Sequence, residues 1–305
     1  MAVQPPIVQA GDTVGIVTLG SPLEAATIDA RVQYLEAMGL NVVLGNHVYD
    51  WDGFLAASNE ERAADLMAMF ENDDVNMILP TRGGVGVAGI LPYLDYPLIH
   101  ARPKWLSGYS DITVLLNALY QFGNIISLHS LMLIDFRATT PAYNFEQFFS
   151  VVSSADITHE IVNPPDFPPL NGRVPGNVTG PIVGGNLASF VGTLGTAFET
   201  DTTGSILFLE EVNEPINTVY RWMQHLEQAG KFADCEGIIL GECSDCQIAY
   251  GQDYEDLIEN FFVPMGKPLI TGLASGHGTY KAAVPIGAVA NLNSEEGTIT
   301  VVSEG

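Results

Sequence analysis

Residues 104–119 of this 305-residue chain read Lys104-Trp-Leu-Ser-Gly-Tyr-Ser-Asp-Ile-Thr-Val-Leu-Leu-Asn-Ala-Leu119. A short apolar run passes through Gly108 and leads directly into an apolar segment of helical character. A strand followed closely by a helix is the repeating unit of an α/β fold. Ser110 lies at the turn between the two elements, where such folds expose side chains beyond the carboxyl end of a strand.

The same alternation of strand and helix precedes this stretch. The strand-like runs are short and apolar, whereas the helical segments carry apolar residues three or four positions apart. The strands are expected at residues 13–18, 41–44 and 75–79, and the helices at 25–38 and 59–70. Ser58 is the expected N-cap of the second helix. Alternating elements of this kind predict an α/β fold with a mostly parallel, doubly wound sheet.

A proline-rich segment divides the chain. Residues 163–181 accumulate prolines and lose all periodicity, which indicates a semi-rigid linker. We therefore expect an N-terminal domain over residues 1–162 and a smaller C-terminal α/β domain over residues 182–305. Within the second domain we expect helices at 186–194 and 220–229, strands at 205–210 and 237–240, and a hairpin over 288–301 through Gly297.

Composition limits the partners and the location of the protein. The formal charge of −25 repels nucleic acid and anionic membranes, so we expect neither as a partner. No apolar run reaches the roughly 18 residues that span a bilayer, and the first residues do not resemble a signal peptide. A cytoplasmic location is the resulting expectation.

The cysteines agree with a reducing compartment. Cys235, Cys243 and Cys246 are too few for a disulfide framework. The Cys243-x-x-Cys246 spacing occurs in redox and zinc sites, but no second pair of ligands follows it. We expect ordinary free thiols and no metal.

Ser110 has two interpretations that its own segment leaves open. The helix behind it offers unpaired N–H groups and a positive dipole end to a developing oxyanion, which suits a nucleophile. The segment departs from the G-x-S-x-G pattern, because Ile112 stands where the second glycine belongs. Alternatively, Ser110 is an N-cap.

A nucleophilic serine needs a base and an orienting acid. His277 lies between two glycines in Ala274-Ser-Gly-His-Gly-Thr279, where it serves neither a helix nor a core, so it is the expected base. His129 is expected to be structural. Glu210 and Glu211 end an apolar strand and point opposite ways, so one of them is the expected acid, and alternation alone does not decide which.

The loop after the third strand is rich in glycine. Its Gly84-x-Gly86-x-x-Gly89 spacing resembles a dinucleotide fingerprint, but a fingerprint belongs to the first strand–helix turn, and here Pro92 follows within a few residues. We expect no cofactor. The loop is better suited to close backbone approach to a substrate, with Arg82 as a clamp for an anion.

Taken together, these residues resemble the LD-carboxypeptidase family of serine peptidases, which includes the microcin-immunity hydrolases. The likeness covers nearly the whole chain. Its motifs are Gly11-Asp-Thr-Val-Gly-Ile16, Glu61-Arg-Ala-Ala-Asp-Leu66, Arg82-Gly-Gly-Val-Gly86, Gly108-Tyr-Ser-Asp-Ile-Thr113, Gly184-Gly-Asn-Leu187, Leu207-Phe-Leu-Glu-Glu211 and Ser275-Gly-His-Gly278.

The resemblance implies a flavodoxin-like or amidotransferase-like first domain that carries the nucleophile Ser110. It implies that the second domain supplies the acid Glu210 and the base His277, and that the backbones of Asp111 and of the loop near Gly84 bind the oxyanion. Members of this family remove the terminal D-alanine of murein tetrapeptides in cell-wall recycling, without metal and often as homodimers.

Three alternatives stay open. An immunity-type hydrolase would cleave a peptidyl or aminoacyl amide of a nucleotide, whose base needs an aromatic partner, and residues 163–181 offer only Phe167. A second alternative is a non-catalytic muropeptide-binding protein, against which the complete set of Ser, Glu and His argues. The third is a nucleotide-dependent oxidoreductase, against which the displaced fingerprint argues.

Overall fold

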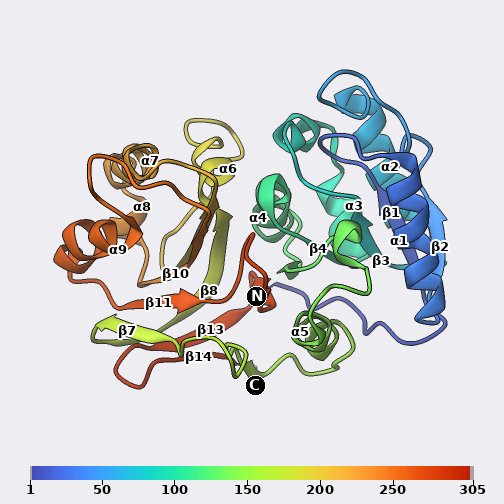
Figure 1. Cartoon of the computed structure of the whole chain (residues 1–305). Coiled ribbons are helices and arrows are strands. Elements are labelled where there is room, and N and C mark those ends of the chain that lie inside the picture. The colour runs from blue at the N-terminus through green and yellow to red at the C-terminus, as the bar shows by residue number, and fades with distance from the viewer. Residues whose placement is uncertain (1, 303–305) are drawn as a thin grey trace. The chain divides into compact units, whose positions relative to one another are not determined.

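The computed structural model describes residues 2–302, which form two compact units divided between Ala155 and Asp156. Each unit is built on its own sheet (Figure 1). The predicted α/β class is therefore confirmed.

The sheet of the first unit is parallel. Its strands within this unit lie in the order β5-β4-β3-β1-β2, and every neighbouring pair is parallel. They are β1 (Thr13–Val17), β2 (Asn41–Leu44), β3 (Val75–Pro80), β4 (Trp105–Gly108) and β5 (Ser127–His129). This is the flavodoxin-like order, in which ligands bind beyond the carboxyl ends of the strands.

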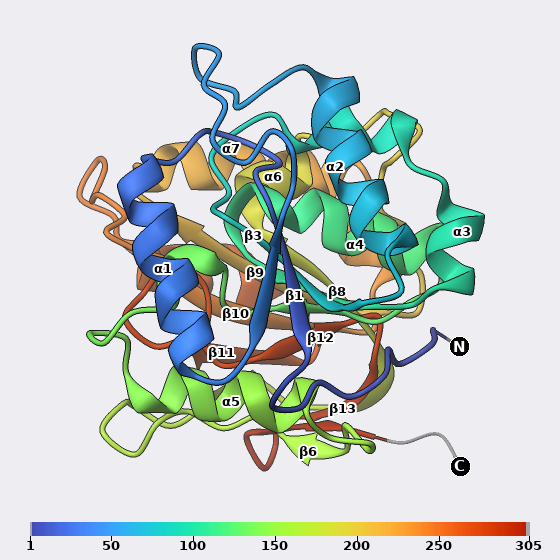
Figure 2. The same cartoon turned by 90° about the vertical axis from the view of Figure 1, so that its right-hand side faces the viewer.

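Helices cover both faces of this sheet. Figure 2 shows α1 (Ala25–Ala37) on one side of β1, with α2 (Asn59–Glu71), α3 (Tyr96–Ala101) and α4 (Thr113–Gln121) on the other. Tyr34 of α1 stacks on Phe145 of α5 (Ala142–Val152). Three short 3₁₀ helices complete the unit: η1 (Val87–Tyr93), η2 (Ser110–Ile112) and η3 (Leu133–Asp135).

The second unit has a mixed sheet in the order β6-β14-β13-β8-β9-β10-β11-β7. The run from β8 to β11 is parallel and the remaining pairs are antiparallel. The strands are β6 (His159–Glu160), β7 (Asn171–Val174), β8 (Asn177–Asn186), β9 (Ile206–Val212), β10 (Gly237–Ser244), β11 (Leu269–Leu273), β13 (Val289–Asn293) and β14 (Thr298–Val301). A further short strand, β12, covers Val284–Ile286. The predicted hairpin through Gly297 is confirmed.

The helices of the second unit are shorter on average. They are α6 (Leu187–Val191), α7 (Ile216–Gln228), α8 (Lys231–Asp234) and α9 (Tyr254–Leu257), followed by the π-helix η4 (Ile258–Phe262) and the 3₁₀ helix η5 (Val263–Met265). Phe232, Phe261 and Phe262 pack edge to face and join α8 to η4.

The segment 163–181 contains regular structure that its sequence does not announce. It holds β7 and the first half of β8, and it lies inside the second unit. β7 pairs with β11, about a hundred positions further along the chain, so the partner that stabilises it leaves no local pattern. The residues of this segment that lie outside strands are those before Asn171 and the pair Pro175 and Gly176 between β7 and β8.

The prediction of free thiols is wrong for two cysteines. Cys243 and Cys246 form a disulfide, with their Cα atoms 5.4 Å apart. The end of β10 turns back on itself here, because the N–H of Cys246 donates to the carbonyl of Cys243 and Asp245 adopts a positive φ. Cys235 is a buried free thiol, and burial raises its pKa to about 11. In the described part of the chain, no helix is both long and apolar enough to span a bilayer.

Ser58 caps α2 as predicted. Its Oγ accepts from the N–H of Glu61, and the Glu61 carboxylate accepts from the N–H of Ser58 in return. This reciprocal capping box satisfies two donors at the helix start. We predict that Ser58→Ala lowers the free energy of unfolding by about 1 kcal/mol, measured by urea denaturation.

The control is Ser150→Ala. Ser150 is exposed in α5, where its Oγ donates to the carbonyl of Gln147. The change should stay within about 0.5 kcal/mol of wild type. Equal effects at the two positions would contradict the role of Ser58.

Candidate active site

Ser110 occupies a strained turn between β4 and α4. Its φ is 61°, a left-handed conformation that few residues other than glycine adopt. Neither η2, which begins at Ser110, nor α4 has a side-chain capping hydrogen bond. The N-cap interpretation is therefore wrong. Strain at a strand–helix turn is typical of an exposed nucleophile, since the surrounding structure must enforce it.

The glycine loop lies directly against Ser110. A Cβ atom added to Gly83 would stand 2.7 Å from Cβ of Ser110, 2.9 Å from its Oγ and 3.1 Å from the backbone N of Asp111. Gly84 has a φ of +90° and approaches Ser21 in the same way. Only glycine allows backbone to come this close, so the loop brings its backbone against the serine.

Asp111 ties the turn to the far end of this loop. Its Oδ2 accepts from the N–H of Val87 at 2.8 Å, at the start of η1. Arg82 is half-buried and makes no side-chain hydrogen bond or ion pair within residues 2–302. Its guanidinium therefore has donors available for an anion.

Glu210 and His277 meet in the second unit. Glu210 lies in the buried part of β9 and is 1% exposed, and its Oε2 lies 2.9 Å from Nδ1 of His277. A carboxylate in this position favours the tautomer with the proton on Nδ1, which leaves Nε2 able to accept a proton. Gly276, with a φ of +121°, is required here, because a Cβ would lie 2.4 Å from the same carboxylate oxygen.

Glu211 has a different task. It points away from Glu210 and accepts from the N–H groups of Ala188 and Val212 and from the amide of Asn186. Burial raises the pKa of its carboxyl. The choice that alternation left open thus has a geometric answer: Glu210 contacts His277, and Glu211 supports the start of α6.

Two residues with positioning roles, Asn163 and Arg62, were not predicted from the sequence. Asn163 accepts from the N–H of Ala274 at 2.9 Å and donates to the carbonyl of Gly272 at 2.7 Å, which fixes the approach to the His277 loop. Arg62, in the first unit, is completely buried. A lone arginine among alanines in α2 was the available signal, but a helix pattern does not tell which carbonyls such a side chain reaches.

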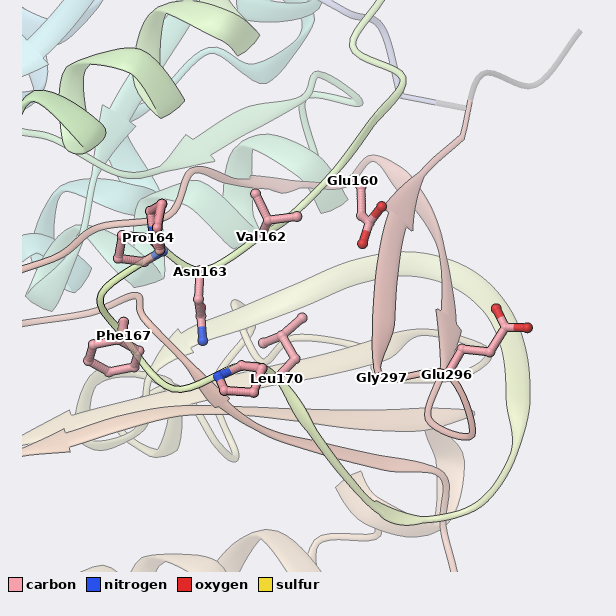
Figure 3. A pocket seen from close by; sticks show the side chains of 10 residues that line it. Glu160, Val162, Asn163, Pro164, Phe167, Leu170, Glu296 and Gly297 are labelled. Carbon is pink, nitrogen blue, oxygen red and sulfur yellow. The ribbon is translucent and has the colours of Figure 1, made fainter.

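A hollow of about 420 Å³ lies in the second unit. Figure 3 shows the side chains that line it. It is lined by Glu160, Val162, Asn163, Pro164, Pro165, Phe167, Pro169, Leu170, Glu296 and Gly297. Neither Glu210 nor His277 contributes to it. Phe167 borders the hollow and also packs edge to face on Tyr280, at 6.0 Å between ring centroids.

The described residues match two family models. Residues 14–130 match the N-terminal domain of LD-carboxypeptidases, and residues 179–292 match the C-terminal domain. The chain belongs to the LD-carboxypeptidase family, and it is a serine-type carboxypeptidase.

Individual relatives agree with this assignment. The chain is 35% identical to the probable murein peptide carboxypeptidase of Bacillus subtilis, over 99% of this chain and 96% of the relative. The muramoyltetrapeptide carboxypeptidase of Oxalobacter formigenes has the same fold, with a TM-score of 0.83, 26% identity and coverage of 95% and 97%. The Escherichia coli microcin C7 self-immunity protein MccF superposes with a TM-score of 0.89, 25% identity and 99% coverage of both chains.

We predict that Gly83→Ala lowers kcat on the order of 100-fold. The new methyl would lie 2.7 Å from Cβ of Ser110, too close for van der Waals contact, and would therefore displace the serine. Release of product from a murein peptide gives the measurement. Gly11→Ala is the control: it has a φ of +92° but nothing within 4 Å, so it strains the backbone without touching the serine. A Gly83→Ala enzyme with wild-type kcat would refute the contact.

We predict that Glu210→Gln and Glu211→Gln separate function from stability. The amide at position 210 can donate to Nδ1 and select the wrong tautomer, so kcat should fall by about 10³- to 10⁴-fold. The amide at position 211 cannot accept all its present hydrogen bonds, so unfolding free energy should drop by about 1–3 kcal/mol while kcat stays near wild type. The reverse ranking of kcat would show that the acid is Glu211.

Proposed function

We propose that the chain hydrolyses the L,D-peptide bond to the terminal D-alanine of murein tetrapeptides, a step of cell-wall recycling. The observation that carries the proposal is the hydrogen bond that Nδ1 of the glycine-flanked His277 donates to the buried carboxylate of Glu210. The names of the relatives from Bacillus subtilis and Oxalobacter formigenes support the substrate class.

In the proposed mechanism, Nε2 of His277 removes the proton from Oγ of Ser110, and the oxygen attacks the carbonyl carbon of the scissile bond. The tetrahedral intermediate collapses when His277 returns the proton to the departing amine of D-alanine. Water, deprotonated by His277, then hydrolyses the acyl-enzyme. Glu210 holds the imidazole and stabilises its cationic form.

We propose that the N–H groups of Asp111 and Gly84 bind the oxyanion. Support comes from the approach of the glycine loop to Ser110 and from the hydrogen bond that joins Asp111 to Val87. Arg82 then binds the carboxylate of the terminal D-alanine, since its guanidinium can form two parallel hydrogen bonds to such a group.

The remaining expectations belong to the same proposal. Residues 1–162 would carry the nucleophile and residues 182–305 the acid and the base, joined through residues 163–181. The enzyme would act without metal as a cytoplasmic homodimer on a small muropeptide.

A second candidate is the hydrolysis of aminoacyl or peptidyl amides of nucleotides. The structural match to MccF favours it, and MccF has been solved with aspartyl sulfamoyl adenosine. The only aromatic residue that the segment 163–181 offers to a nucleobase is Phe167, which already packs against Tyr280. This contact favours the carboxypeptidase.

We predict that wild type releases D-alanine from murein tetrapeptide and that Ser110→Ala reduces the rate by at least about 10³-fold, followed by mass spectrometry. In parallel, calorimetry measures the binding of aspartyl sulfamoyl adenosine to both proteins. Equal release by the two proteins would exclude Ser110 as the nucleophile. Tight analogue binding without any release would favour the nucleotide amide, and muropeptide binding without turnover would indicate a binding protein.

A further inference from the structure

A buried arginine links the two loops beside Ser110. Arg62 is 0% exposed, and within residues 2–302 all hydrogen-bond acceptors of its guanidinium are amide oxygens. Nη1 reaches the carbonyls of Leu19 and Gly86, Nε reaches that of Ala57, and Nη2 reaches the side chain of Asn59. One planar group thus holds several separate stretches of backbone, which a guanidinium does better than any other side chain.

Two of these carbonyls belong to loops that touch each other. Leu19 lies just beyond β1, and Gly86 closes the glycine loop beyond β3. The N–H of Ser21 donates to the carbonyl of Gly83, and a Cβ on Gly20 would stand 2.3 Å from that same oxygen. Fixing Leu19 and Gly86 therefore also limits how far Gly83 can move.

Removing the charged guanidinium of Arg62 from water costs free energy, since the side chain has no exposed surface. Burial lowers the pKa of Arg62, while the carboxylate of Asp111 acts in the opposite direction. An apolar residue would avoid the desolvation but would leave the carbonyls of Leu19 and Gly86 without these donors. Asp111, whose carboxylate interacts electrostatically with Arg62, directly follows Ser110 in the chain.

We propose that Arg62 is a positioning residue for the reaction. Its guanidinium holds the glycine loop against Ser110 and so fixes the spacing between the serine and the oxyanion donors at Gly84 and Asp111. This inference rests on the proposed role of Ser110. Arg62 acts through the backbone of the loop and does not touch the substrate.

Lys104 provides a matched control. It is 7% exposed, lies in the same unit, and its Nζ donates to the carbonyls of Met69 and Asn72. These carbonyls lie at the end of α2, before the start of β3, whereas the glycine loop follows the carboxyl end of β3. Arg62→Met and Lys104→Met therefore both remove a buried cation that binds backbone carbonyls. Only the first should disturb Ser110.

The experiment measures kcat, KM and thermal stability of both variants with murein tetrapeptide, together with the rate at which a fluorophosphonate probe labels Ser110, followed by intact mass. Both variants should lose stability. Only Arg62→Met should lose kcat and labelling rate, each by about 100-fold with KM nearly unchanged. Low, non-denaturing guanidinium should restore part of the labelling in Arg62→Ala and none in Lys104→Met, and Arg62→Lys should recover only a fraction.

Equal kcat and equal labelling in the two methionine variants, at a temperature where both are folded, would overturn the proposal. Its failure differs from a failure of the proposed function. If wild type is labelled at Ser110 but releases no D-alanine, the substrate is wrong and the labelling still tests Arg62. If Ser110→Ala releases D-alanine and wild type is not labelled, the role of Ser110 is wrong and the inference falls with it.

Discussion

The contact between the Gly83 backbone and Ser110 is the constraint on which the first unit depends. The serine holds a φ of 61° that its own residue type disfavours, so neighbouring structure must supply the energy that maintains it. Because Gly83 has no side chain, the glycine loop can lie against Ser110. The carboxylate of Asp111 accepts from Val87 at the end of this loop, and Arg62 donates to the carbonyl of Gly86 within it. The parallel sheet places all of these at one edge, because β1, β3 and β4 run in the same direction.

Cations have an unusual distribution in this acidic chain. Four of its eleven lysines and arginines are buried in the described residues, and each donates to backbone carbonyls: Arg62, Lys104, Lys231 and Lys281. Lys281 holds the carbonyl of Gly278 in the His277 loop, as Arg62 holds that of Gly86 in the glycine loop. The buried cations thus donate to backbone carbonyls. One cation can bind several such carbonyls and so hold a loop in place.

In the second unit, the loop that carries His277 must also be held in position. The glycines beside His277 permit the loop to approach Glu210, but they do not hold it there. Asn163 and Ser275 supply the hydrogen bonds that do, to Gly272, Ala274 and Ala282. The loop is therefore positioned by one side chain of the motif, Ser275, and by Asn163, which lies more than a hundred positions earlier in the chain.

The sequence by itself determined the α/β class, the strands β1 to β4 and the helices α1, α2 and α4 of the first unit, the Ser58 cap and the candidates Ser110, Glu210 or Glu211 and His277, because periodicity, capping and glycine spacing are local signals. Only the tertiary structure decided that Glu210 contacts His277, that Ser110 is strained instead of capping a helix, that residues 171–174 form a strand, and that Cys243 and Cys246 pair. These outcomes depend on partners distant in sequence or on the path of a turn, and a linear pattern encodes neither.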